Sequence, residues 1–203
     1  MDNFIATFIT TMAKSKLAGF LIGIGVIANI TAANPVLGAF LFSLGLLAIM
    51  QLQLQLFTGK VGDLIYAKKE NKLLPFIFLG NVIGIETAII CYACANPNFD
   101  AALQAASAAK FSKDYFQMLA CGIFCGVLIH IAVKSKQFYI TILSIMAFIL
   151  IGAEHCIADI PYLVKSFSFV NLSKFGLVVL GNISGSLYAE RLSGFYDKVR
   201  GDK

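Results

Sequence analysis

AFILIGAEHCIADIPYLV, residues 147–164, is an apolar run of membrane-spanning character that three ionisable residues interrupt. Without Glu154, His155 and Asp159 the run would be typical of a transmembrane helix. An ionisable side chain at bilayer depth is energetically costly and usually faces an interior cavity, where it marks the path of a substrate or ion. The stretch therefore predicts a pore through a membrane protein, with His155 at its middle.

The composition of the whole chain supports a polytopic membrane protein. Hydrophobic residues make up 59% of the 203 residues and charged residues 13%, whereas soluble domains are about half apolar and about a quarter charged. Six spans of about 20 residues would occupy roughly 120 positions. We therefore predict an all-α membrane protein with short loops and no large extramembrane domain.

Hydrophobic runs and their flanking polar residues define the predicted organisation. The predicted spans are 17–33, 36–69, 73–95, 115–133, 138–164 and 170–192. Residues 1–16 are predicted to form a cytoplasmic amphipathic segment, a disordered tail being the alternative. Residues 17–193 form the six-helix channel domain, and residues 194–203 a cytoplasmic tail.

Two of these spans contain polar interruptions. Span two carries Gln51, Gln53 and Gln55 before Thr58-Gly59, and span five breaks at 152–155. Non-helical backbone at this depth survives only where it is buried in protein or lines a wet cavity. Each broken span is the middle one of three, so the halves form an inverted 3+3 repeat with a site near the midplane.

The distribution of basic residues predicts the orientation. One side of the predicted topology carries eleven lysines and arginines and the other side four, with Lys60 inside span two. The excess places both termini in the cytoplasm of a cell whose inner (plasma) membrane holds the chain. Because the basic residues cluster at loop ends, the net charge of +5 does not indicate a nucleic-acid partner.

The five cysteines do not predict a metal or cofactor site. All lie in hydrophobic segments, and the Cys91–Cys94 pair lacks the second pair that zinc sites require. A membrane enzyme or metal site built from Cys, His and Glu is the weaker alternative, because adjacent His155 and Cys156 point to different helix faces. We expect no catalytic residue, no bound metal and no cofactor.

Four motifs in order resemble the formate/nitrite transporter family, pentameric small-anion channels with an aquaporin-like protomer. The resemblance covers about residues 16–192. The motifs are FSLGLLAIMQLQLQLFTGK (42–60), CGIFCGVLIHIAV (121–133), GAEHCIAD (152–159) and LGNISG (180–185). The resemblance implies an aquaporin-like fold with helices 2 and 5 broken, a homopentamer in the lipid bilayer, and small anions such as formate, nitrite or hydrosulfide as substrates.

The resemblance also implies residue roles. His155 matches the central histidine, and Thr58 matches the threonine that hydrogen-bonds it. The matching apolar pore positions are Phe42 and Leu46 (cytoplasmic slit), Leu56 and Phe57 (constriction), Ile129 (pore lining) and Phe148 (periplasmic slit). The matching supporting positions are Lys110 in the outer vestibule, Glu154 beside the histidine, and Asn182 on the sixth helix.

The chain departs from the family pattern at several positions. Asp159 replaces an asparagine four residues after the histidine, Gly126 replaces a fourth-helix asparagine, and Lys60 follows Thr58-Gly59. We expect Glu154 to hold backbone amides of the broken helix, and Asp159 to pair with nearby backbone because no basic partner is evident. His130 is expected at a membrane interface, while Glu86 has no assigned role.

Two collars, Leu46 with Phe42 and Phe148 with Leu56, are predicted to strip water from an anion between them. A weak-acid anion would take a proton near His155 and Thr58 and cross as the neutral acid. An aquaporin-like pore for water or small neutral solutes is the alternative, although paired Asn-Pro-Ala signatures are missing.

Overall fold

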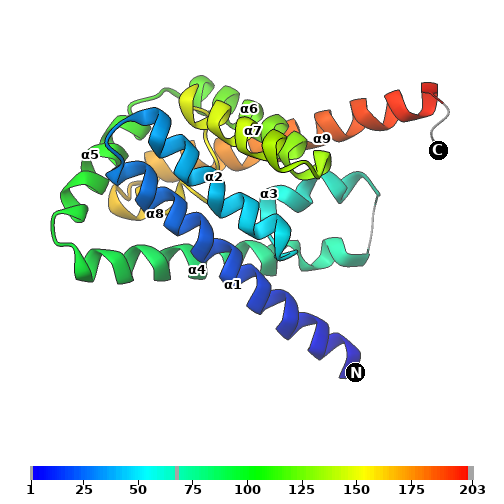
Figure 1. Cartoon of the computed structure of the whole chain (residues 1–203), viewed down its shortest axis with the longest axis horizontal. Helices are drawn as coiled ribbons and strands as arrows, with labels where there is room; N and C mark the ends of the chain where they lie inside the picture. The colour runs from blue at the N-terminus through cyan, green and yellow to red at the C-terminus, as the bar shows by residue number, and fades with distance from the viewer. Residues whose placement is uncertain (1, 67–68, 201–203) are drawn as a thin grey trace.

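The computed structural model describes the backbone of residues 2–66 and 69–200 and the side chains of residues 4–66 and 71–196. Every regular element in this part of the chain is helical, which confirms the predicted all-α class. The long helices run roughly along one axis, and both termini lie at the same end of the molecule (Figure 1). The elements are α1 (Asp2–Thr31), α2 (Pro35–Gln51), α3 (Phe57–Lys60), η1 (Val61–Tyr66), η2 (Lys69–Leu73), α4 (Leu74–Ala95), α5 (Phe99–Phe111), α6 (Tyr115–Ser135), α7 (Phe138–Leu150), α8 (Ile160–Lys165) and α9 (Phe169–Arg200).

The helices pack in a pattern that repeats between the two halves of the chain. In the first half α1 packs along α4, and in the second half α6 packs along α9. The middle element of each half is interrupted, between α2 and α3 and again between α7 and α8. Because α2 also packs against α7, the two interrupted elements face each other between the two long pairs.

Glycines allow the long pairs to approach at equivalent places. A Cβ atom on Gly84 of α4 would overlap the backbone of Lys16 on α1, and a Cβ on Gly185 of α9 would overlap the backbone of Ile123 on α6. Small residues at such crossings let helix backbones approach closely in membranes.

Several helices extend beyond the predicted boundaries. Helix α1 crosses residue 16 without a break, and α9 continues past residue 193 as far as Arg200. No helix therefore begins or ends at the predicted boundaries after residues 16 and 193. Residues 201–203 of the predicted tail lie outside the described part of the chain. The predicted loop 96–112 contains α5, because its alanine-rich sequence favours a helix and Phe99, Leu103 and Phe111 bury one face of it.

Apolar length distinguishes the intact helices from the interrupted ones. Helices α1, α4 and α6 contain segments long and apolar enough to cross a membrane: Phe4–Thr31, Asn71–Ala95 and Tyr115–Ser135. Helices α2 and α7 are apolar but shorter, because each stops at a break. Large apolar side chains such as Phe116 (78% exposed) and Phe169 (84% exposed) cover the outer surface, as expected of a chain surrounded by lipid. The count of six spans stays a prediction.

Replacing Gly84 with alanine tests the close approach of α1 and α4. The added methyl group overlaps backbone, so we expect destabilisation of about 1–3 kcal/mol, measured by thermal unfolding in detergent. Gly176→Ala is the matched control, because nothing lies within 4 Å of a Cβ there. A Gly84→Ala protein that unfolds at the temperature of Gly176→Ala would contradict this packing.

Candidate functional site

The helices before the two breaks end in the same way. Gln53 (φ 49°) and Gly152 (φ 71°) adopt the left-handed conformation shortly after α2 and α7 end. In each case the amide of the following residue, Leu54 or Ala153, donates to the carbonyl five residues earlier at 2.9 Å. This hydrogen bond and the left-handed residue are features of a Schellman helix end. Gln53 adopts this conformation although it is not a glycine, which is why the sequence pattern alone did not locate the first turn.

Asn81 of α4 bridges the first break. Its side-chain oxygen accepts a hydrogen bond from the amide of Phe57 at 2.9 Å. Its side-chain amide donates to the carbonyl of Gln55 at 2.9 Å and to that of Ser15 on α1 at 2.8 Å. Asn81 is fully buried, so one side chain supplies partners for both ends of the interruption.

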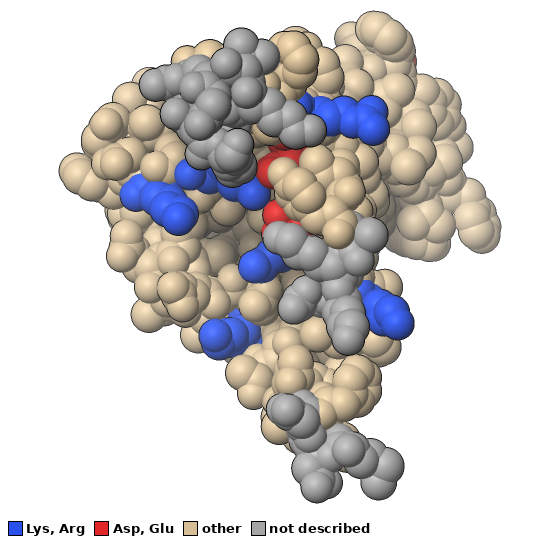
Figure 2. Space-filling model, turned by 90° about the vertical axis from the view of Figure 1, so that its right-hand side faces the viewer, with Lys and Arg blue, Asp and Glu red and all other residues tan. Residues whose placement is uncertain are grey.

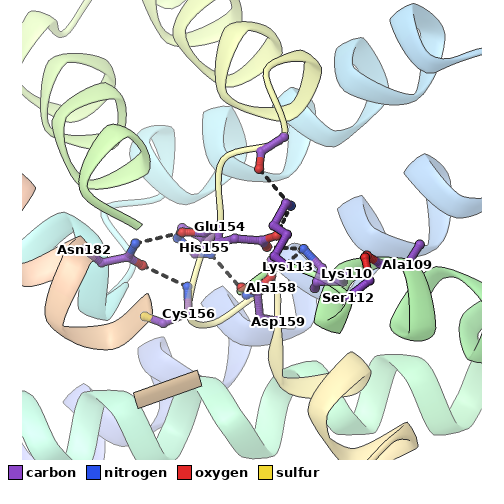
Figure 3. Close-up of polar contacts among 11 residues, drawn as sticks. Ala109, Lys110, Ser112, Lys113, Glu154, His155, Cys156, Ala158, Asp159 and Asn182 are labelled. Carbon is purple, nitrogen blue, oxygen red and sulfur yellow. Dashed lines mark hydrogen bonds and ion pairs between the residues drawn. The ribbon is translucent and has the colours of Figure 1, made fainter. Parts of the chain in front are cut away.

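Asn182 of α9 bridges the second break with the same three bonds. Its oxygen accepts from the amide of Cys156 at 2.8 Å. Its amide donates to the carbonyl of Glu154 at 2.8 Å and to that of Gly122 on α6 at 2.9 Å. Figure 3 shows Asn182 reaching both sides of the broken segment.

The two bridging asparagines share a local sequence. Residues 79–84 read LGNVIG and residues 180–185 read LGNISG. Only the second copy was predicted to be functional, and the repeat of Leu-Gly-Asn followed by glycine is the signal that would have identified Asn81. In each copy the last glycine allows two helices to approach closely, and the asparagine side chain hydrogen-bonds the interrupted backbone next to it.

Thr58 and His155 meet between the two breaks. Thr58 Oγ1 lies 2.8 Å from His155 Nε2, and their exposed fractions are 1% and 2%. The backbone amide of Ala158 donates to His155 Nδ1 at 3.1 Å. Because Nδ1 must be an acceptor, a neutral ring carries its hydrogen on Nε2 and donates it to Thr58. The threonine hydroxyl accepts this bond and keeps its own hydrogen to donate.

The apolar residues predicted to line the path are all buried. Phe42 packs edge-to-face on Phe148, with ring centroids 5.7 Å apart, and the Phe148 ring stacks on His155 at 6.1 Å. Phe42 therefore contacts Phe148, whereas the sequence analysis paired it with Leu46.

The other apolar residues lie elsewhere around the site. Leu46 and Leu56 line a cavity on the side of α3, as described below. Phe57 packs edge-to-face on Phe78 of α4, with centroids 5.1 Å apart, and lines neither of the two cavities described here. Ile129 is 2% exposed on α6 and also lines neither cavity. Phe57 thus has a packing contact on α4, and its predicted place at a constriction stays a prediction.

Two cavities approach this buried group from opposite sides. We name the two cavities outer and inner after the predicted orientation. The outer cavity, of about 100 Å³, is bounded by Phe42, Phe148 and His155 together with charged residues near α5. The inner cavity, of about 530 Å³, is bounded by Leu46, Leu56 and Gly59 together with three lysines. These lysines are Lys14, Lys60 and Lys136. Figure 2 shows basic side chains gathered at the end of the molecule where both termini lie.

Charged side chains form a network at the outer cavity. Glu154 is completely buried, and its two oxygens pair with Lys110 and Lys113. Lys113 also donates to the carbonyl of Gly152 at 3.1 Å. Lys110 Nζ lies 3.0 Å from Asp159 Oδ1. Figure 3 shows both lysines reaching from the end of α5 to the broken segment.

This network corrects two predictions. Glu154 binds two lysines through its side chain, and not the backbone amides that the sequence suggested. Asp159 has a basic partner, Lys110, which its sequence neighbourhood did not predict. Lys113 was missed as a site residue because its approach depends on α5, in a segment predicted as a loop.

The carboxylates control the charge of Lys110, which lies on α5, in the segment that joins α4 to α6 along the chain. Burial alone lowers the pKa of Lys110, but the nearby carboxyl groups of Asp159 and Glu154 more than offset it and raise the pKa above its usual value. Lys110 therefore stays positively charged in the outer cavity at neutral pH.

A second polar cluster joins η1 to α6 and α9. His130 is 7% exposed, and its Nε2 lies 3.5 Å from a carboxylate oxygen of Glu190. Glu190 also pairs with Lys134 at 2.9 Å and accepts from Tyr66 at 2.6 Å. His130 is thus buried in a helix contact, whereas the sequence predicted an interfacial position.

Glu86 and Lys60 are two further positions to which the sequence assigned no role. Glu86 is partly buried on α4, and its Oε1 has no hydrogen-bond partner among the described residues. Lys60 lines the inner cavity. In the described part of the chain, no group of three His, Cys, Asp or Glu side chains is arranged to hold a metal ion.

Comparison with known proteins gives one family throughout. The family model of the formate/nitrite transporters matches residues 2–192. The formate channel FocA of Haemophilus influenzae is 25% identical over 147 residues, which cover 62% of this chain and 52% of that protein. The match thus spans about half the length of this curated relative.

Two solved structures have the same fold. A channel described as an FNT family ion channel superposes with a TM-score of 0.80 at 19% identity, covering 96% of this chain and 91% of its own. A pentameric formate channel with formate bound gives a TM-score of 0.74 at 20% identity, covering 98% and 99%.

Replacing Asn182 with alanine tests the bridge across the second break. The change leaves an amide and two carbonyls without this partner, and each unsatisfied buried group costs about 1–3 kcal/mol. We expect a large fall in thermal unfolding temperature, or loss of folded protein in detergent. Asn98→Ala is the control, because Asn98 is exposed and makes no capping bond. Wild-type stability of Asn182→Ala would contradict the bridging role.

Proposed function

This chain belongs to the formate/nitrite transporter family, and on that premise we propose that it carries small monovalent anions of weak acids across a membrane. Formate, nitrite and hydrosulfide are the candidate substrates. The observation that carries the proposal is the buried Thr58–His155 pair, which lies between two cavities bounded by lysines.

Lysines near both cavities would attract an anion. Lys110 and Lys113 border the outer cavity, and Lys14, Lys60 and Lys136 border the inner one. Charge of one sign in a cleft with low-dielectric walls raises the local concentration of the opposite ion. An anion would therefore gather at both ends of the path.

Buried apolar side chains separate the cavities and would act as the barrier. Phe42 and Phe148 close the outer side, and Leu46 and Leu56 border the inner side. Taking an isolated charge into such surroundings is far more costly than taking in a neutral polar molecule. An anion whose acid is weak can take a proton and cross as the neutral acid. Chloride and nitrate cannot, because their acids are too strong.

His155 and Thr58 would hold the substrate in the middle of the barrier. His155 donates its Nε2–H to Thr58, so the hydroxyl hydrogen of Thr58 is the donor that this pair leaves free for the substrate. A second proton on His155 would set its Nδ1–H against the amide hydrogen of Ala158. We therefore assign His155 a polarising role as a neutral donor, with the transferred proton coming from another group.

The membrane arrangement follows the same reasoning. Both termini lie at one end of the molecule (Figure 1), and the excess of basic residues assigns that end to the cytoplasm of a cell with the chain in its inner membrane. The exposed apolar surface would contact lipid and neighbouring protomers. We propose a homopentamer with one path in each protomer, after the pentameric formate channel that shares the fold.

Formate uptake by proteoliposomes tests the central pair. Losing one hydrogen bond of about 1.4 kcal/mol lowers a rate about tenfold. We therefore expect Thr58→Val and His155→Ala to slow uptake at least that much. Thr58→Ser keeps the hydroxyl and should remain near wild type.

Osmotic water flux is measured on the same vesicles. Equal formate uptake by wild type, Thr58→Val and His155→Ala would contradict the assigned site. Water flux without formate uptake would favour the neutral-solute pore instead.

A further inference from the structure

Asp159 is a buried carboxyl group that the path described above does not use. It precedes α8 at the N-cap position but makes no capping hydrogen bond. It is 1% exposed and borders the outer cavity beside His155. Oδ1 lies 3.0 Å from Lys110 Nζ, whereas Oδ2 is buried with no hydrogen-bond partner among the described residues. A buried carboxylate oxygen without a donor is costly, and a proton on that oxygen removes the cost.

Asp159 and Glu154 compete for the same positive charges. Lys110 pairs with both carboxyl groups, and Lys113 pairs with Glu154. Two carboxyl groups in one buried site do not both ionise readily, and the pair holds one proton. Because both oxygens of Glu154 face ammonium groups, Glu154 is the charged member and Asp159 is the member that holds the proton.

We propose that Asp159 donates the proton with which a weak-acid anion becomes neutral in the outer cavity. The O–H bond of Asp159 breaks, and the same proton forms a bond to an oxygen of formate or nitrite, or to the sulfur of hydrosulfide. Asp159 is left as a carboxylate beside Lys110, and a hydronium ion from the outer solution restores its proton. This proposal rests on the proposed anion transport.

The charges in the outer cavity balance at each stage of this transfer. With Asp159 protonated, Lys110, Lys113 and Glu154 leave one net positive charge, which an entering monovalent anion neutralises. After the transfer, two ammonium groups face two carboxylates and the acid that moves toward Phe148 is neutral. From the entry of the anion to the departure of the neutral acid, the net charge of the buried site stays at zero, which avoids the cost of an uncompensated buried charge.

The surrounding groups do not offer a better donor. His155 accepts the Ala158 amide at Nδ1 and so has no second proton to release. Lys110 and Lys113 form ion pairs with the two oxygens of Glu154. Several titratable groups surround Asp159 or act on its charge. They are Lys110 of α5, Lys113 between α5 and α6, Cys121 and Cys125 of α6, Glu154, His155 and Cys156 of the broken segment, and Tyr162 of α8.

Asp159→Asn keeps the shape of the protonated carboxyl group and removes its acidity. The amide has nearly the same size, and its oxygen can still accept from Lys110, but it cannot release a proton at neutral pH. The resemblance to the family places an asparagine at this position, so the fold should tolerate it. Glu86→Gln is the matched control, because Glu86 is another intramembrane carboxyl with an unpaired buried oxygen that borders neither cavity.

Two measurements on membrane-embedded protein test the proposal. Infrared spectroscopy at neutral pH should show a protonated-carboxyl band that formate perturbs, present in wild type and Glu86→Gln and lost in Asp159→Asn. Formate uptake, corrected for protein-free vesicles, should rise as the external pH falls in wild type and Glu86→Gln. The rise should be lost in Asp159→Asn.

The outcomes distinguish a failure of the proton transfer from a failure of anion transport. Loss of both the band and the pH response in Asp159→Asn supports the proton transfer. Uptake by wild type without the band, or a pH response unchanged in Asp159→Asn, overturns the transfer and leaves anion transport standing. No formate uptake by wild type at any pH overturns the proposed function and the transfer with it.

Discussion

A helix that stops inside a membrane leaves backbone groups without partners, and no water is present to replace them. Asn81 and Asn182 meet this constraint in the two halves of the chain, each with one accepted and two donated hydrogen bonds. These bonds also tie each broken element to the first and third helices of its half. The positions of the other site residues depend on this arrangement, because Thr58 and His155 both lie in the segments that the asparagines hold.

The site combines groups with opposite electrostatic requirements. In the proposed path, lysines would attract an anion, while the aromatic contact of Phe42 with Phe148 would disfavour an ion. A neutral His155 between them offers a hydrogen bond without adding a positive charge that would trap the ion. Conduction needs binding that is strong enough for entry and weak enough for release. A substrate that loses its charge inside the path, as proposed here, would satisfy both requirements.

Part of this arrangement could be predicted from the sequence. Local patterns predicted the helical class and the two breaks, because glutamines, glycine and ionisable residues stand out in apolar runs. The meeting of Thr58 with His155 was implied by the resemblance to the family. The pairs of Asp159 with Lys110 and of Glu154 with Lys113 could not be predicted in this way. They join segments about 40 to 50 residues apart, and their contact depends on α5 folding back over the broken helix.

The central claim is that the path distinguishes anions by the strength of their acids. Formate and chloride uptake by one preparation of proteoliposomes at neutral pH measures this most directly. The account predicts formate entry well above that of protein-free vesicles, and chloride entry no faster than in them. Equal entry of both anions, or entry of neither, would contradict it.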